Sequence, residues 1–263
     1  MNIIRIVCAA AVACLTTSSL RAAEPVTFSK DVAPVVFQHC TPCHRPGEIG
    51  PFSLQTYRDV RQRMTLVADT TKRRAMPPWK PESAHGVFVD DRSLTAEQIQ
   101  LVQDWVAQGA PEGDPKDLQP IPVFVEGWRL GTPDVVVTMA QPYTLRPDGP
   151  DLFRTFVLPI PTSGARYVRA IEFRPGNGRG VHHANIGVDR TRSSRRLDAE
   201  DSEPGYVGGM VQDAAYPPGH LLGWTPGQQP RPSPEGTAWR LEADSDLVVQ
   251  LHLQPTGKPS RSR

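Results

Sequence analysis

The chain has 263 residues, enough for two modest domains, and its 29 Lys and Arg side chains nearly balance 28 Asp and Glu, giving a net charge of +1. That balance excludes nucleic acid as the main partner, because phosphate binding needs a concentrated basic surface. The 28 prolines and 21 glycines require much of the chain to form turns, edges and extended segments, which favours a loop-rich globular fold.

The first 23 residues have the pattern of a secretory signal. Positive charge at Arg5 is followed by an apolar stretch, Ile6–Leu15, and then by small residues up to Ala23. Cleavage after Ala23 predicts a periplasmic or secreted protein, and a lipoprotein cut before Cys14 is the alternative. The apolar stretch is too short to span a bilayer, and no later one reaches about 18 residues, so we expect no integral membrane segment in the mature chain.

Three parts follow the signal: residues 24–113 with helical patterns, a proline-rich linker at 114–122, and 123–263 with short β-type runs. Thr95 and Gln98 predict a capping box at the start of the clearest helix, and Gly109 its end. Ser29 is the expected cap of the first helix. The apolar spacing predicts helices over residues 30–40, 54–70 and 96–108.

Cys40-Thr41-Pro42-Cys43-His44 has the spacing of c-type haem attachment. Residues three and four apart lie on one side of a helical turn, so two thiols can bond the vinyl groups of one haem while His44 faces the iron. A thioredoxin-like redox pair would need a preceding strand, and a zinc site would need a second Cys or Cys/His pair. The sequence shows neither, so it predicts covalent haem c.

The sixth iron ligand is predicted to be a methionine, whose thioether raises the haem potential. Met76 precedes two prolines that forbid a helix and fix a loop. Met64 is the rival, but it lies on the apolar stripe of a predicted helix, where Met usually fills the core. The remaining alternatives are His39 and His85.

Residues 26–113 resemble a small class I cytochrome c domain. The resemblance rests on the Cys40–His44 motif, on the Met76-Pro77-Pro78-Trp79 loop, and on a closing helix that ends in Trp105-Val106-Ala107-Gln108-Gly109. It implies an all-α fold. Trp79 and Trp105 are expected to pack around the porphyrin, and a core role without haem contact is the alternative for either.

Alternating apolar residues and turn signals in the third part predict an antiparallel β-sandwich, which we expect to be jelly-roll-like. The whole chain is therefore expected to be an α domain followed by a β domain. The strand candidates are residues 134–139, 153–158, 167–173, 181–188 and 247–253.

Three histidines of this part, His182, His183 and His252, form a candidate metal site, because neutral imidazole suits copper, zinc, iron and nickel. Leu251 and Leu253 alternate with His252, which places His252 on the face away from the apolar layer. Neighbours on a regular strand point to opposite faces, so joint ligation by His182 and His183 requires a bulge or a strand end. The alternative is a docking module with incidental histidines; a surface role is expected for His220.

The β part also resembles the N-terminal half of the copper type II, ascorbate-dependent monooxygenases, which include peptidylglycine α-hydroxylating monooxygenase. The matching residues are Val181-His182-His183-Ala184 and Val248-Val249-Gln250-Leu251-His252. The resemblance implies one electron-transfer copper on His182, His183 and His252. The family's oxygen-activating copper needs two further His and a Met, and none follows His252. We therefore expect a fragment or truncated reading frame.

These patterns predict an exported cytochrome that transfers single electrons through haem and passes them to a copper site made of three histidines. Its partner would be a redox protein or a small reductant. The alternative is a copper monooxygenase with a built-in haem reductant, whose oxygen-activating half is missing from this chain. No residue is assigned a catalytic role, and an electron carrier is expected for this chain alone.

Overall fold

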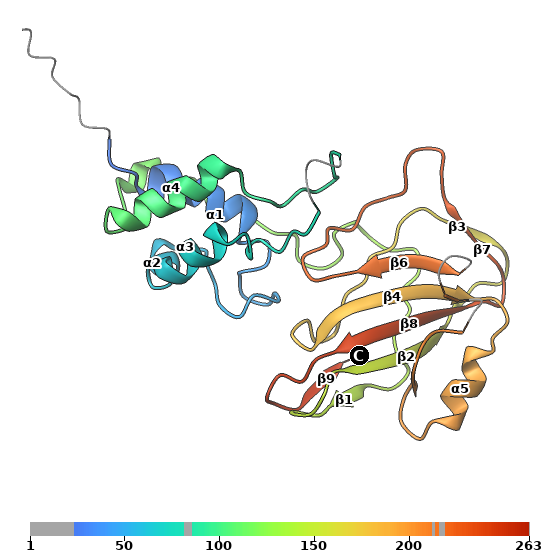
Figure 1. Cartoon of the computed structure of the whole chain (residues 1–263). Coiled ribbons are helices and arrows are strands. Elements are labelled where there is room, and N and C mark those ends of the chain that lie inside the picture. Colours follow the sequence, from blue (N-terminus) through green and yellow to red (C-terminus); the bar gives the residue numbers. More distant parts are fainter. Residues whose placement is uncertain (1–23, 82–85, 212–213, 216–218, 263) are drawn as a thin grey trace, which may run out of the picture.

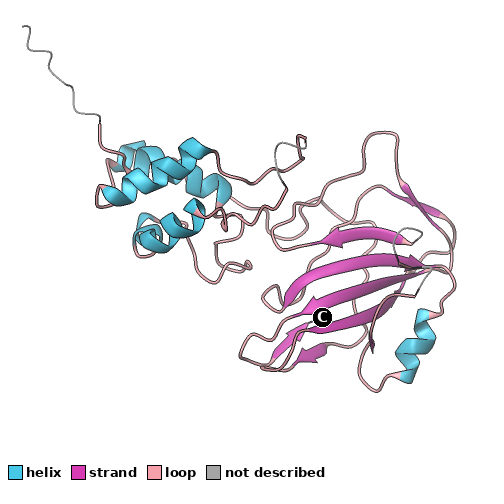
Figure 2. Cartoon of the chain, viewed as in Figure 1, coloured by secondary structure: helices cyan, strands magenta, loops and turns pink. Residues whose placement is uncertain are grey.

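The computed structural model describes residues 24–81, 86–211, 214–215 and 219–262. The expected signal, residues 1–23, and the alternative ligand His85 lie outside the described residues. The helices of residues 28–107 gather in one half of the molecule and the strands in the other, where one further helix lies beside them, as Figure 2 shows. Among the described residues, no helix combines the length and apolar character needed to cross a bilayer.

The helical part begins with a π-helical turn, Phe28–Val32, that continues into α1 (Ala33–His39). The prediction that Ser29 caps this helix was wrong: Ser29 lies inside the first turn, buried, with its N–H bonded to the carbonyl of Glu112 at 2.9 Å. Pro34 is the second residue of α1, directly after the π-helical turn, which agrees with the expectation that it lies near the start of the α-helix.

Two short helices, α2 (Tyr57–Arg61) and α3 (Met64–Lys72), replace the single helix expected over residues 54–70. The backbone of Arg63 leaves helical geometry at φ −121° and ψ 13°, which breaks the element. Helix α4 (Ala96–Ala107) confirms the predicted capping box, since Thr95 Oγ1 accepts from the N–H of Gln98.

The helices share one apolar core that contains no strand residue. Trp105 of α4 is fully buried and donates its indole N–H to the Pro111 carbonyl at 2.9 Å. The predicted linker at 114–122 contains a 3-10 turn, Pro115–Asp117, and otherwise no regular structure. The core members are Phe28, Val32, Ala33, Val36, Phe37, Leu54, Val60, Val67, Ala68, Val102, Trp105 and Ala110.

The β part is built on a five-stranded antiparallel sheet with the order β5-β2-β8-β4-β6 (Figure 1). Two small ladders, β1 with β9 and β3 with β7, contribute Leu145 and Leu241 to the same core as the large sheet. Helix α5 (Ser194–Glu200) lies beside this part. The strands are β1 (Tyr143–Leu145), β2 (Leu152–Pro159), β3 (Arg166–Val168), β4 (Val181–Asp189), β5 (Tyr206–Val207), β6 (His220–Trp224), β7 (Trp239–Leu241), β8 (Asp246–Leu253) and β9 (Ser260–Ser262).

One strand prediction was wrong and another was correct only in part. Residues 134–139 form no strand: Val135 and Val136 are exposed, while Val137 and Met139 pack against the core from an extended segment without a ladder partner in the described structure. The strand expected at 167–173 is limited to Arg166–Val168, followed by an isolated bridge from Ala170 to Pro232.

Candidate functional site

The three histidines predicted to bind metal meet on adjacent strands. His183 of β4 is the register partner of His252 of β8, and Phe153 of β2 is the partner of His252 on its other side. The β4–β8 register shifts between Val181 and His183, which confirms the predicted irregularity. The bulge lets two consecutive residues turn toward one point.

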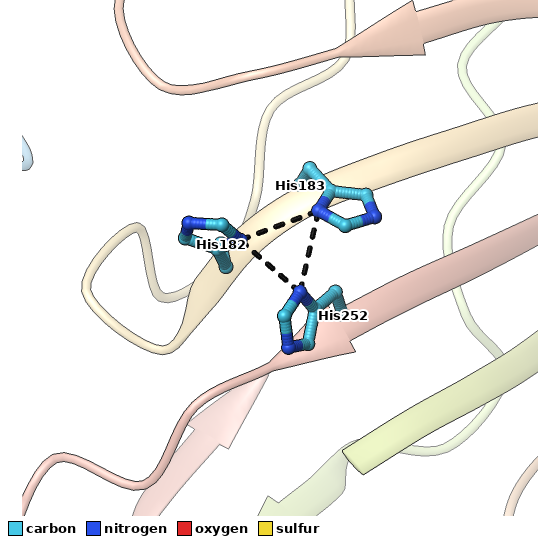
Figure 3. A group of neighbouring side chains, drawn as sticks. All are labelled: His182, His183 and His252. Atoms are coloured by element: carbon cyan, nitrogen blue, oxygen red, sulfur yellow. Dashed lines mark hydrogen bonds between the residues drawn. The ribbon is translucent and has the colours of Figure 1, made fainter. Parts of the chain in front are cut away.

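The three rings converge through their Nδ1 atoms (Figure 3). The separations are 3.3 Å for His182–His183, 3.1 Å for His182–His252 and 3.3 Å for His183–His252. Three nitrogens about 2.0 Å from a metal at tetrahedral angles would lie about 3.3 Å apart. The triangle therefore fits one ion held by three imidazoles, with a further position open, and the exposure of His182 places the site at the surface.

Asp151, just before β2, fixes the tautomer of His252. Its Oδ2 lies 2.9 Å from Nε2 of His252 and accepts at 2.9 Å from the side-chain amide of Gln254. A neutral imidazole that donates from Nε2 keeps the Nδ1 lone pair for a metal. The hydrogen bonds from Gln254 and His252 lower the pKa of Asp151, which keeps it an ionised acceptor.

The surroundings also favour neutral imidazole in His183. Burial, then the neighbouring His252 and His182, lower the pKa of His183 below its usual range. Phe153 stacks on the ring of His252, with centroids 4.2 Å apart and planes at 13°. His220 lies on β6 outside this group and is exposed.

The Cys40–His44 motif forms one helical turn after the end of α1. The N–H of His44 bonds the Cys40 carbonyl at 2.8 Å, an i to i−4 bond, and the N–H of Cys43 bonds it at 3.1 Å. Both thiols are free. Burial raises the pKa of Cys43 and raises that of Cys40 to about 12, although part of the Cys40 surface is accessible. Both sulfurs are therefore neutral thiols.

The hydrogen bonding of His44 leaves its Nε2 free to bind a metal. Its Nδ1 lies 3.2 Å from the Phe52 carbonyl, so it carries the proton, and Nε2 keeps its lone pair. The Phe52 ring packs on the imidazole with centroids 4.9 Å apart. Burial lowers the pKa of His44, which favours the neutral ring.

Two buried donors near this turn have no hydrogen-bond partner among the described residues: Arg92 Nη1 and Trp79 Nε1. Arg92 is close enough to Cys43 to lower its pKa, and its guanidinium lies 5.9 Å from the Trp79 ring. Buried donors cost free energy unless they are paired. Haem carries carboxylates that can accept from such donors, so the donor chemistry of these residues is compatible with a haem.

The predicted sixth ligand lies on the loop that follows α3. Met76 is 43% exposed, and its role as a haem ligand stays a prediction. The rival Met64 is the first residue of α3, packs against the helical core and has Arg61 Nη1 at 2.8 Å from its sulfur. His39 is held by the Arg92 carbonyl and the Gln98 side chain, each at 3.4 Å.

Sequence patterns missed Asp151, Phe153 and Arg92. Asp151 stands two residues before a predicted strand, but its role depends on the pairing of that strand with the one that carries His252.

Comparison with family models, with curated proteins and with solved structures gave no match for this chain.

Proposed function

We propose that this chain is an exported c-type cytochrome that transfers single electrons through covalent haem and exchanges them with one copper ion on His182, His183 and His252. Residues 24–113 would be its small class I cytochrome c domain, and residues 123–263 a jelly-roll-like sandwich related to the N-terminal half of the copper type II monooxygenases. Bound haem would supply reversible one-electron chemistry at iron.

The single observation that carries the haem assignment is a helical turn in which the N–H groups of Cys43 and His44 both bond the Cys40 carbonyl. The tautomer of His44 supports it, as do Arg92 Nη1 and Trp79 Nε1, two buried donors without a partner in the described part of the chain. In this arrangement Cys40 and Cys43 would hold the porphyrin, and His44 and Met76 would bind its iron.

The copper assignment is supported by the three converging Nδ1 atoms and by the carboxylate behind His252. Imidazole triads also suit zinc, so the metal must be identified by experiment. Copper is preferred here because it changes oxidation state and can exchange an electron with haem, whereas zinc cannot.

The experiment is expression in a host that performs cytochrome c maturation. The protein should carry one haem that stays with the denatured polypeptide, and the Cys40→Ser/Cys43→Ser variant should lose it. Bare polypeptide mass in the wild-type chain would overturn the haem assignment.

Copper titration should saturate near one ion per chain. After the bound copper is reduced, added zinc should not displace it. His183→Ala should abolish binding, whereas His220→Ala, on a neighbouring strand, should leave it unchanged. Equal binding by both variants would favour the docking module with incidental histidines.

A second candidate function is a copper-dependent, ascorbate-type monooxygenase with haem as built-in reductant. The matching His182-His183 pair and His252 favour it. That chemistry needs a second, oxygen-activating copper, so we expect no oxygen-dependent hydroxylation with ascorbate from this chain alone. Measured hydroxylation would establish the second candidate instead.

A further inference from the structure

The connection between β6 and β7 reaches the Cys40–His44 turn. Gly227 has φ +81°, and a Cβ added to it would lie 2.7 Å from Cys43 Sγ and 2.7 Å from Arg92 Nη1. The glycine backbone is therefore in direct contact with the thiol and the guanidinium of the helical part. Figure 1 shows this connection running from the end of β6 toward the helices.

Opposite charges surround this contact. Arg231, four residues after Gly227, forms a two-pronged ion pair with Asp90 of the helical part, with Nε 2.7 Å from Oδ2. Arg129 donates at 3.1 Å both to Glu48, which follows the Cys40–His44 turn, and to Gln229 of the β6–β7 connection. Fork-shaped guanidinium pairs fix orientation as well as proximity.

A further contact joins the helical part to Phe124, which follows the linker. The guanidinium of Arg45, directly after His44, lies 4.0 Å above the ring of Phe124. Arg45 also pairs with Glu48 at 2.6 Å, so one connected set of charges extends from the haem motif through Arg129 to the β part. The helical part is thus docked through the segment that would carry haem.

The residues just before Gly227 belong to β6, the strand that pairs with β4, which carries His182 and His183. Trp224 stands three residues before Gly227, at the end of β6, and its Cα partner on β4 is Ala184. Ala184 is the immediate neighbour of His183. The Trp224 ring is partly buried against the β core, with its edge toward the Phe173 ring at 5.1 Å between centroids.

We infer that the segment Thr225–Arg231 is a docking surface for the Cys40–His44 turn, and that electrons pass between the two sites of the chain through Cys43, Gly227, Trp224 and His183. The electron route rests on the proposed function; the docking contact does not. With both groups bound, haem held by Cys40 and Cys43 would give up one electron and copper held by the three histidines would accept it, so that no bond or proton would be exchanged.

Two glycines offer a matched test of the route. Gly227 and Gly236 lie in the same connection and have nearly equal positive φ values, +81° and +78°, so Val strains both backbones alike. Only at Gly227 does the added side chain meet Cys43 and Arg92; at Gly236 it meets nothing within 4 Å. The measurement uses the full chain with haem attached and one Cu(II) bound.

Haem is reduced by a light-triggered one-electron donor, and its reoxidation is followed together with loss of the Cu(II) paramagnetic signal. Gly227→Val should slow this internal transfer several-fold, and Gly236→Val should leave it unchanged. Equal rates in the two variants, with both metals bound, would overturn the route alone. Failure to take up haem or copper would overturn the proposed function, and the route with it.

The docking contact has a test that needs no electron transfer. In the mature chain, Arg231→Asp and Asp90→Arg should each accelerate amide hydrogen exchange across residues 225–231, because each leaves two like charges in contact. The double variant restores opposite charges and should restore slow exchange. Additive acceleration in the double variant would overturn the docking surface.

Discussion

Asp151 and His252 are joined by a 2.9 Å contact between Oδ2 and Nε2, on the side of the imidazole opposite to the nitrogen that faces His182 and His183. Gln254 holds the same carboxylate oxygen from two residues further along the chain. The carboxylate therefore sets which nitrogen of His252 is free, while remaining outside the triangle that would hold the metal.

Replacing Asp151 should weaken the metal site without removing a ligand. Loss of such a carboxylate behind a ligating His costs about 10- to 100-fold in metal affinity. We expect Asp151→Ala to lower copper affinity in this range and to change the Cu(II) paramagnetic spectrum. Asp148→Ala, an exposed carboxylate in the same loop, is the control. Unchanged affinity in Asp151→Ala would show that packing alone orients His252.

Substitution of Met76 and of Met64 tests which of the two methionines binds the haem iron. Met ligation raises the haem potential, so Met76→Leu should lower the midpoint potential of the mature protein. Met64→Leu should leave it nearly unchanged, because Met64 packs in the helical core. Potentiometric titration of both variants checks this. A lowered potential in Met64→Leu alone would transfer the assignment to Met64.

The ion pair between Arg154 and Asp201 should make stability depend on pH. Arg154 is almost fully buried and donates to Asp201 at 2.9 Å and to the carbonyls of Pro204 and Gly205. Hydrogen bonds from the Glu203 backbone and from Arg154 lower the pKa of Asp201. A carboxyl group whose pKa is lower in the folded protein than in the unfolded chain stabilises the fold at every pH above its ordinary pKa of 3.8. This stabilisation is lost as the pH falls through the pKa of the folded protein.

Asp201→Asn should therefore lower the Tm at pH 7, and the difference from the wild-type chain should shrink as the pH falls below about 4. Thermal unfolding across this range measures it. Glu200→Gln, the exposed neighbouring residue, should show little difference at any pH. A Tm difference that persists at about pH 2 would assign the effect to packing of the side chain rather than to its charge.

The candidate metal residues could be predicted from local sequence because each has a local signature. Cys40 and Cys43 precede His44 at helical spacing, and His252 alternates with core leucines. The need for an irregular strand at His182 and His183 followed from strand geometry, and the register shift confirms it.

The contacts that could not be predicted from sequence depend on pairing between distant segments. Asp151 meets His252 across 101 positions, and Gly227 meets Cys43 across a longer separation. The segment 134–139 shows the opposite error: three consecutive valines have high strand propensity, but within the described chain no neighbouring strand pairs with them. Local propensity predicts which segments can extend, whereas long-range packing decides which become strands.

Trp105 should be the most sensitive single position of the helical core. Its ring is fully buried, lies 6.1 Å from the Phe28 ring, and donates an indole hydrogen bond to Pro111. Trp105→Ala should cost about 3–5 kcal/mol of unfolding free energy, because it leaves a cavity and also an unpaired carbonyl. Chemical denaturation followed by helical circular dichroism measures this loss. Leu66→Ala, an exposed site on α3, is the control and should change stability by at most about 0.5 kcal/mol. Equal losses in the two variants would mean that the helical core is not packed around Trp105.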